Sequence, residues 1–112
     1  MNTFVAKITF QIICGAGDHR PQFDEQLRLI FAENGELALE SALQIGEAEQ
    51  SSFYNRNEQL VQWKFTGVAD LQLVELEHGA EVWSGIVEVE SAGHYVQEVR
   101  SRELGIRNLE LG

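Results

Sequence analysis

Two stretches near the N-terminus alternate between apolar and polar side chains, and this alternation constrains the fold more than any other feature. The first stretch places its apolar side chains at even positions: Phe4, Ala6, Ile8, Phe10, Ile12 and Cys14. The second runs over residues 23–31 and has these apolar side chains at odd positions: Phe23, Leu27, Leu29 and Phe31. A period of two predicts a half-buried β-strand. The polar segment 15–21, rich in turn-forming residues, joins the two strands, so we expect them to pair antiparallel.

Residues 35–50 predict an amphipathic helix that packs on this sheet. Asn34 is a favourable N-cap because its side-chain oxygen can accept a hydrogen bond from a free N–H group of the first turn. Apolar side chains fall on one side of the helical wheel, and glutamate and glutamine fall on the other. Two sets of residues are expected to bury against each other: Ala38, Leu39, Ala42 and Ile45 of the helix, and Phe4, Ile8 and Phe10 of the first strand.

The second half of the chain predicts three more strands and a tail. The strands are expected at residues 61–66, 71–76 and 82–89. Gly67 marks a bend or bulge between the first two. The polar segment 51–58 is expected to be a loop, and the tail 95–112 fits a short helix better than a further strand.

The expected fold class is therefore α+β. An antiparallel sheet of about five strands, in the order strand-strand-helix-strand-strand-strand, carries one main helix on one face. A chain of 112 residues is the size of one domain, so residues 1–112 are expected to form a single unit. Its core spans residues 3–90, and residues 91–112 form a C-terminal extension.

The chain is acidic, with 8 basic and 18 acidic side chains and a formal net charge of −10. Nucleic acids and anionic membranes repel such a surface, because their binding depends on Lys and Arg. We therefore expect neither partner. The simpler interpretation of this charge is solubility, and the more specific one is that the chain binds a basic protein partner.

The location expected from the sequence is the cytoplasm. The single cysteine, Cys14, cannot form an intramolecular disulfide, so nothing indicates an oxidising compartment. No apolar run has the length of a membrane span, and residues 1–10 do not have the pattern of a secretion signal.

Two motifs in the second half resemble a known family. The run Trp63-Lys-Phe-Thr-Gly-Val-Ala-Asp-Leu71 and the turn His78-Gly-Ala-Glu-Val82 look like the bacterial family called domain of unknown function 4288. The resemblance covers about residues 4–90 and includes the expected helix. It implies a compact bacterial α+β domain, and it implies no mechanism because the family has no assigned activity.

Four residues of these motifs are candidate functional residues: Trp63, Asp70, His78 and Glu81. A tryptophan that alternates with Phe65 in a strand is more often part of a core than of a ligand platform. Asp70 fits a turn or cap after Gly67. Either Asp70 or Glu81 could serve as a general acid or base if a pocket enclosed it.

Other chemical groups are sparse. Cys14 and His19 could form a thiolate and base pair, although a core cysteine is the simpler interpretation. No ligand spacing typical of zinc occurs, so we expect no metal and no cofactor; a composite site of His94 with Glu75, Glu77 or His78 is the nearest alternative. The run Gly15-Ala-Gly17 is not followed by a helix, as a phosphate-binding loop requires.

Two hypotheses for function stay open. The first is a non-enzymatic domain that binds another protein through its acidic surface, for example an immunity protein against a basic toxin. The second is a small-molecule-binding domain or minor enzyme with a carboxylate and histidine pocket between the sheet and the tail. The distribution of the acidic residues would discriminate the two hypotheses.

Self-association is also expected, because an open sheet leaves two edges that must be covered or paired. The tail carries apolar residues that need a contact: Tyr95, Val96, Val99, Leu104, Ile106 and Leu109. Its charge is balanced, with Arg100, Arg102 and Arg107 against Glu98, Glu103 and Glu110. We therefore predict a homodimer in which the tail or an edge strand takes part. The alternative is a monomer whose tail folds back over its own sheet.

Overall fold

The fold is α+β, as the sequence predicts. A computed structural model describes residues 1–109. Its elements, in chain order, are β1 (Asn2–Cys14), β2 (Gln22–Ala32), α1 (Gly35–Ala48), β3 (Ser51–Tyr54), β4 (Leu60–Val74) and α2 (Ala92–Arg107). The tail is therefore helical, as expected, and the end of the predicted tail, including Glu110, lies outside the described residues.

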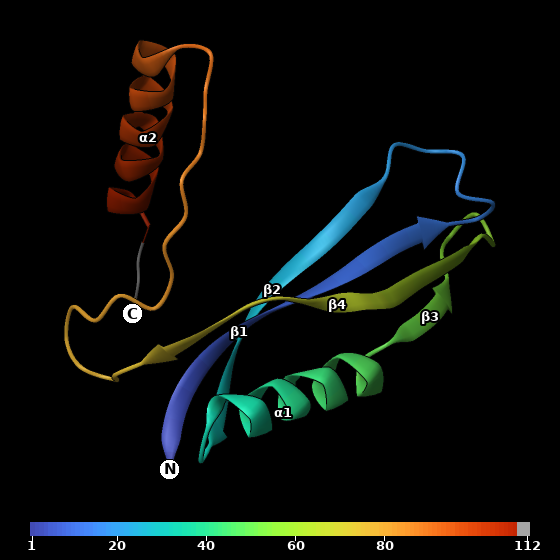
Figure 1. The fold of residues 1–112 in the computed structure, drawn as a ribbon. Helices are drawn as coiled ribbons and strands as arrows, with labels where there is room; N and C mark the ends of the chain where they lie inside the picture. The colour runs from blue at the N-terminus through green and yellow to red at the C-terminus, as the bar shows by residue number, and fades with distance from the viewer. Residues whose placement is uncertain (110–112) are drawn as a thin grey trace.

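The four described strands form one antiparallel sheet in the order β2-β1-β4-β3. β1 lies in the middle, with β2 on one side and β4 on the other, and α1 lies against one face (Figure 1). Phe4 is opposite Ile30 of β2 and Leu73 of β4. The expected antiparallel pairing of the first two strands is confirmed.

The expectation of about five strands is wrong for the described residues. The predicted strands 61–66 and 71–76 merge into one continuous strand, β4, which ends at Val74 and stays paired with β1 through two register shifts. Gly67 lies between these shifts with a positive φ of 156°, so it does mark an irregularity. The predicted strand 82–89 is an unpaired segment, because no neighbouring strand is placed beside it.

The polar segment 51–58 is only partly a loop, since its first four residues form β3. β3 and β4 make a hairpin in which Ser51 is opposite Trp63. The side-chain oxygen of Asn55 accepts hydrogen bonds from the backbone N–H groups of Asn57 (2.9 Å) and Gln59 (3.0 Å). These bonds hold the turn together and align the two strands although β3 has no apolar alternation.

α1 begins as predicted, with the side chain of Asn34 accepting a hydrogen bond from Leu37 N at 2.9 Å. Its buried residues are Ala38, Ala42 and Gly46, spaced four apart. Ile45 packs partly buried against the same core. The expected burial of Leu39 is wrong, because this side chain lies on the flank of the narrow buried stripe and is 41% exposed.

The core lies between α1 and the sheet. It contains the even-numbered residues of β1 together with residues from β2 and α1: Phe4, Ala6, Ile8, Phe10, Ile30, Ala32, Ala38 and Ala42. From β4, Phe65 packs on Phe10 with 5.9 Å between ring centroids. The contact of the helix with Phe4, Ile8 and Phe10 therefore forms as expected.

Polar side chains on the α1 side of β2 fasten this strand to its neighbours. Arg28 forms a two-pronged ion pair with Glu49, the residue that caps the C-terminus of α1, and the Nη1 to Oε1 distance is 3.0 Å. Nε1 of Trp63 in β4 donates a hydrogen bond to Oδ2 of Asp24 at 3.1 Å. These contacts orient β2 with its polar side chains towards α1.

α2 stands away from the rest of the molecule (Figure 1). No Cα atom of α2 lies within 8 Å of a Cα atom in another described helix or strand. The radius of gyration is 17.9 Å, compared with about 13 Å for a compact chain of this length. Neither described helix is long and apolar enough to cross a membrane.

Close packing of α1 on the sheet gives a prediction for Gly46. A Cβ atom at this position would lie within 3.0 Å of three ring carbons of Phe65. We expect Gly46→Ala to lower the free energy of unfolding by about 1–3 kcal/mol, because overpacking outweighs the higher helix propensity of alanine. Denaturant titration measures this change.

Gly35→Ala is the matched control, since a Cβ atom at Gly35 in the same helix meets nothing within 4 Å. This variant should leave the stability unchanged or raise it slightly. Equal effects of the two substitutions would contradict the close approach of α1 to Phe65.

Candidate interaction surface

The register of β1 and β2 places their apolar side chains on opposite faces of the sheet. Even residues of β1 face α1, and their partners in β2 are also even, as Phe4 with Ile30 shows. The odd residues form the other pairs, such as Val5 with Leu29 and Lys7 with Leu27. The apolar alternation of β2 therefore points to the face that α1 does not cover, which we call the open face.

The open face carries an exposed row of large apolar side chains along β2. These side chains are Phe23, Leu27, Leu29 and Phe31, and each is 50–58% exposed. We call them the β2 stripe. Their alternation predicted a half-buried strand, which β2 is, but it did not predict that the apolar side of this strand is the exposed one. One helix covers one face of a sheet, so the second apolar face stays exposed.

Residues 75–83 follow β4 and lie against part of the open face; we call this segment the strap. Leu76 and Val82 of the strap border a hollow of about 300 Å³ together with Val5 and Leu29. The ring of Trp83 lies 4.7 Å from Nζ of Lys7, a cation–π contact. Only 4% of Val5 remains exposed, whereas the β2 stripe stays accessible.

Lys7 connects the strap to β2, because its Nζ also lies 3.0 Å from a carboxylate oxygen of Glu25. The contact of Lys7 with Trp83 was not predicted. Lys7 is the one charged residue of β1, and a lysine in the middle of a strand of otherwise uncharged residues is the signal that could have indicated a partner.

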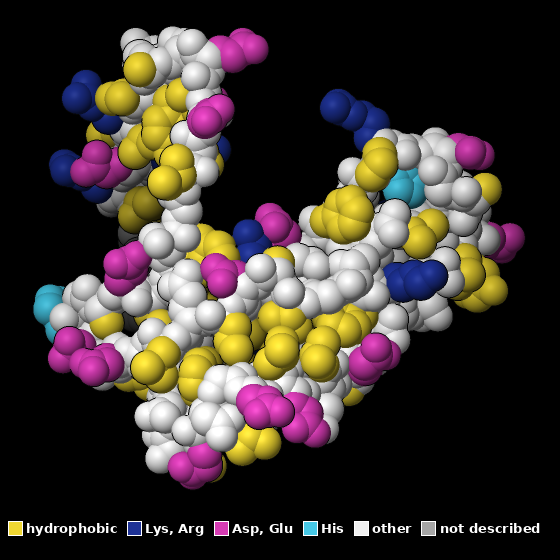
Figure 2. Space-filling model, in the orientation of Figure 1, with side chains coloured by type: hydrophobic (Ala, Val, Ile, Leu, Met, Phe, Trp, Pro, Cys, Tyr) yellow, Lys and Arg dark blue, Asp and Glu magenta, His cyan; other side chains and the backbone are white. Residues whose placement is uncertain are grey.

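α2 carries a second exposed apolar row. Tyr95, Val99 and Ile106 recur at intervals of four and seven residues and therefore lie on one side of the helix. They are 42–55% exposed, and we call them the α2 stripe. Figure 2 shows α2 separated from the body by a wide hollow above the sheet.

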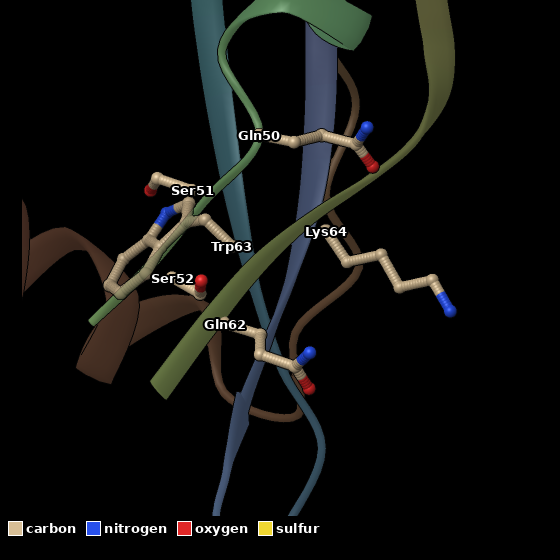
Figure 3. A pocket seen from close by; sticks show the side chains of 6 residues that line it. All are labelled: Gln50, Ser51, Ser52, Gln62, Trp63 and Lys64. Carbon is tan, nitrogen blue, oxygen red and sulfur yellow. The ribbon is translucent and has the colours of Figure 1, made fainter. Parts of the chain in front are cut away.

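Trp63, the first candidate functional residue, lies on the α1 face of β4. Its ring packs against the core and stacks on Phe53 with 6.2 Å between centroids. It also lines an open hollow of about 430 Å³ with Gln50, Ser51, Ser52, Gln62 and Lys64. Figure 3 shows the ends of Gln62 and Lys64 pointing away from the indole ring. These contacts suit a structural role for the tryptophan.

The other three candidates lie elsewhere. Asp70 is on the open face of β4, where its two oxygens accept hydrogen bonds from Leu71 N (2.8 Å) and Gln72 Nε2 (3.1 Å). His78 and Glu81 are exposed residues of the strap. Trp63 and Asp70 point to opposite faces of the sheet, so the structure does not bring the four residues together.

Cys14 and His19 are close, but their geometry does not suit a nucleophile and base. Nε2 of His19 accepts a hydrogen bond from Cys14 N at 3.0 Å, and Nδ1 donates to the backbone oxygen of Arg20 at 2.8 Å. Both ring nitrogens therefore bind backbone groups. The thiol instead lies 3.6 Å from side-chain atoms of Asn55 and Gln59. The histidine ties the loop 15–21 to the end of β1.

The charged groups of the described residues are spread over separate open hollows. Across residues 1–109, no three side chains of His, Cys, Asp or Glu are placed to hold a metal ion. Glu75, Glu77 and His78 lie in the strap, whereas His94 belongs to the first turn of α2. The backbone N–H of His94 donates a hydrogen bond to Ser91 Oγ at 3.2 Å. The composite site of His94 with Glu75, Glu77 or His78 is therefore not assembled in residues 1–109. His94 instead shares a hollow of about 340 Å³ with Glu90 and Glu98, and His19 shares one of about 560 Å³ with Asp18 and Arg20. Neither hollow lies between the sheet and the tail, so the pocket of the second hypothesis stays a prediction.

The comparisons with known proteins identify the family. The model of the family described as "Domain of unknown function (DUF4288)" matches residues 3–84, about three quarters of the chain. The chain belongs to this family. No curated protein and no solved structure matches it. The matched part of this DUF4288 chain contains the sheet, α1 and the strap, and α2 lies outside it.

The separation of the strap residues from α2 gives a prediction for metal binding. Purified protein dialysed against a chelator is expected to retain no stoichiometric zinc in elemental analysis, because no ligand cluster is assembled in residues 1–109. Zinc that stays bound would contradict this, and its loss in His78→Ala or His94→Ala would then locate the site.

The contact between Lys7 and Trp83 gives a prediction for the strap. We expect Trp83→Ala to raise the rate of cleavage after Glu77 and Glu81 by a glutamate-specific protease at least about twofold, because the ring no longer holds the strap on Lys7. Trp83→Phe retains an aromatic ring and is the matched control. Equal cleavage rates for the wild type and Trp83→Ala would show that this contact does not hold the strap.

Proposed function

We propose that this domain is a protein-interaction module that binds a partner through the open face of its sheet. The observation that carries the proposal is the β2 stripe, four large apolar side chains that lie at least half exposed on a regular strand. Water-exposed apolar area of this kind is costly, and contiguous patches of it typically mark interaction sites. A β-strand presents such side chains on a rigid, preorganised surface.

The charge of the chain supports a basic partner. Glu25 lies on the open face between Phe23 and Leu27, and Glu33 directly follows β2. The net charge of −10 attracts a cationic protein over a distance and repels an acidic one. The proposed partner therefore combines an apolar contact surface with a rim of lysine or arginine. Inhibition of a basic toxin would be one instance of this role.

The proposal is tested by comparing the proteins captured from host lysate by three tagged chains: the wild type, a Leu27→Asp/Leu29→Asp variant and a Leu43→Asp variant. Leu43 is an exposed residue of α1, the helix that covers the opposite face of the sheet (Figure 1), so its substitution is the matched control. We expect the open-face variant to capture at least about tenfold less of a specific partner than the wild type, because two charged side chains replace apolar ones in the contact. Circular dichroism and thermal unfolding check that the variants are folded.

Binding of that partner should also weaken as salt is added, since screening reduces the attraction between opposite charges. Capture of the same proteins by all three chains, or capture of no specific protein by the wild type, would overturn the proposal.

A further inference from the structure

We propose that the open face receives α2 of a second copy of this chain, and that the two copies exchange their helices reciprocally. The inference rests on the proposed function and replaces the separate basic protein by a second copy as the occupant of the same face, so the specific protein that the wild type captures from host lysate is then an untagged copy of this chain. Each copy presents two unpartnered apolar surfaces, the β2 stripe and the α2 stripe, both at least 42% exposed. Packing of a helix on a sheet face is the usual way in which such surfaces are buried.

The two stripes match in length. From Phe23 to Phe31 the strand advances by eight residues, or about 26 Å at 3.3 Å per residue. α2 contains 16 residues and spans about 24 Å at 1.5 Å per residue. One helix laid along β2 therefore covers the whole stripe.

The charge balance of α2 differs from that of the body, although two whole copies, each with a net charge of −10, repel one another over a distance. α2 carries three arginines and two glutamates, whereas residues 1–91 carry five basic and fifteen acidic side chains. On the helical wheel, Arg102 and then Glu98 border the α2 stripe on one side, and Glu103, which forms an ion pair with Arg107, borders it on the other. A helix docked on β2 can place Arg102 beside Glu25, the acidic side chain of the open face.

The path of the chain favours a second copy over the helix's own sheet. After the strap, residues 84–91 lead away from the body, and α2 comes near no other described element (Figure 1). The hollow above the sheet leaves the open face accessible (Figure 2). Reciprocal exchange buries the β2 stripe and the α2 stripe of both copies and gives a closed two-fold dimer. Neither stripe is then left to bind a third copy.

Cysteine cross-linking in a Cys14→Ser background tests the contact. Two chains with different tags, one with Leu29→Cys and the other with Val99→Cys, are co-expressed and mildly oxidised. We expect a covalent species that contains both tags. The pair Leu29→Cys and Ser101→Cys is the matched control, because Ser101 lies on the opposite side of α2. This pair should yield at most about a tenth as much of the cross-linked species.

A chain that carries both Leu29→Cys and Val99→Cys distinguishes the alternative in which α2 folds back on its own sheet. An internal disulfide within the monomer, in place of a link between chains, would overturn the proposal. Absence of any cross-link would overturn it as well.

Light scattering on uncross-linked protein gives a second readout. The full chain at tens of micromolar should have twice the 12.6 kDa mass of one copy. Val99→Asp should halve the measured mass, and Ser101→Asp should leave it unchanged. A monomeric full chain, or a dimer unaffected by Val99→Asp, would refute the exchange of α2. Loss of a captured partner by the open-face variant would still support the proposed function in that case, so the two proposals can fail separately.

Discussion

The antiparallel register between β1 and β2 is the constraint on which the rest of the structure depends. Phe4 is opposite Ile30, so even-numbered residues of both strands lie on one face of the sheet and odd-numbered residues lie on the other. The apolar residues of β1 are largely even-numbered and those of β2 are largely odd-numbered, which leaves the sheet apolar on both faces. A slip of one residue would put both apolar sets on one side and remove the open face.

This register is held by contacts on the α1 face of β2. Ile30 and Ala32 join the core, and two of the polar residues before them bind side chains of other elements. Arg28 binds Glu49 at the end of α1, and Asp24 accepts the hydrogen bond of Trp63. If the strand slipped by one residue, these side chains would point to solvent and lose their partners, so the same bonds that stabilise the core keep the β2 stripe exposed.

Local structure was predicted well because it depends on neighbours in the sequence. The period of two located β1 and β2, and the Asn34 cap with the apolar wheel located α1. The tail was correctly expected to be a helix. Predictions that required a distant partner were less successful: residues 82–89 have strand-like composition but no strand beside them, and Ser51–Tyr54 lacks that composition but pairs with β4. The flank position of Leu39 likewise depends on the rotation of α1, which turns Ala38, Ala42 and Gly46 towards the sheet.

The sequence by itself determined the local structure of β1, β2, α1 and α2, because short-range periodicity determines it. It also determined the acidic charge and the family motif around Trp63, which depend on composition and on residue order alone. The tertiary structure decided which apolar side chains are buried, since burial depends on register and on the single face that α1 can cover. It also decided that Trp63 and Asp70 point to opposite faces and that His19 binds backbone groups, so the residues singled out from the sequence do not form one site. The apolar surfaces of β2 and α2 became visible as interaction surfaces only when the fold left them exposed, because an alternating strand has the same sequence pattern whether its apolar face is covered or open.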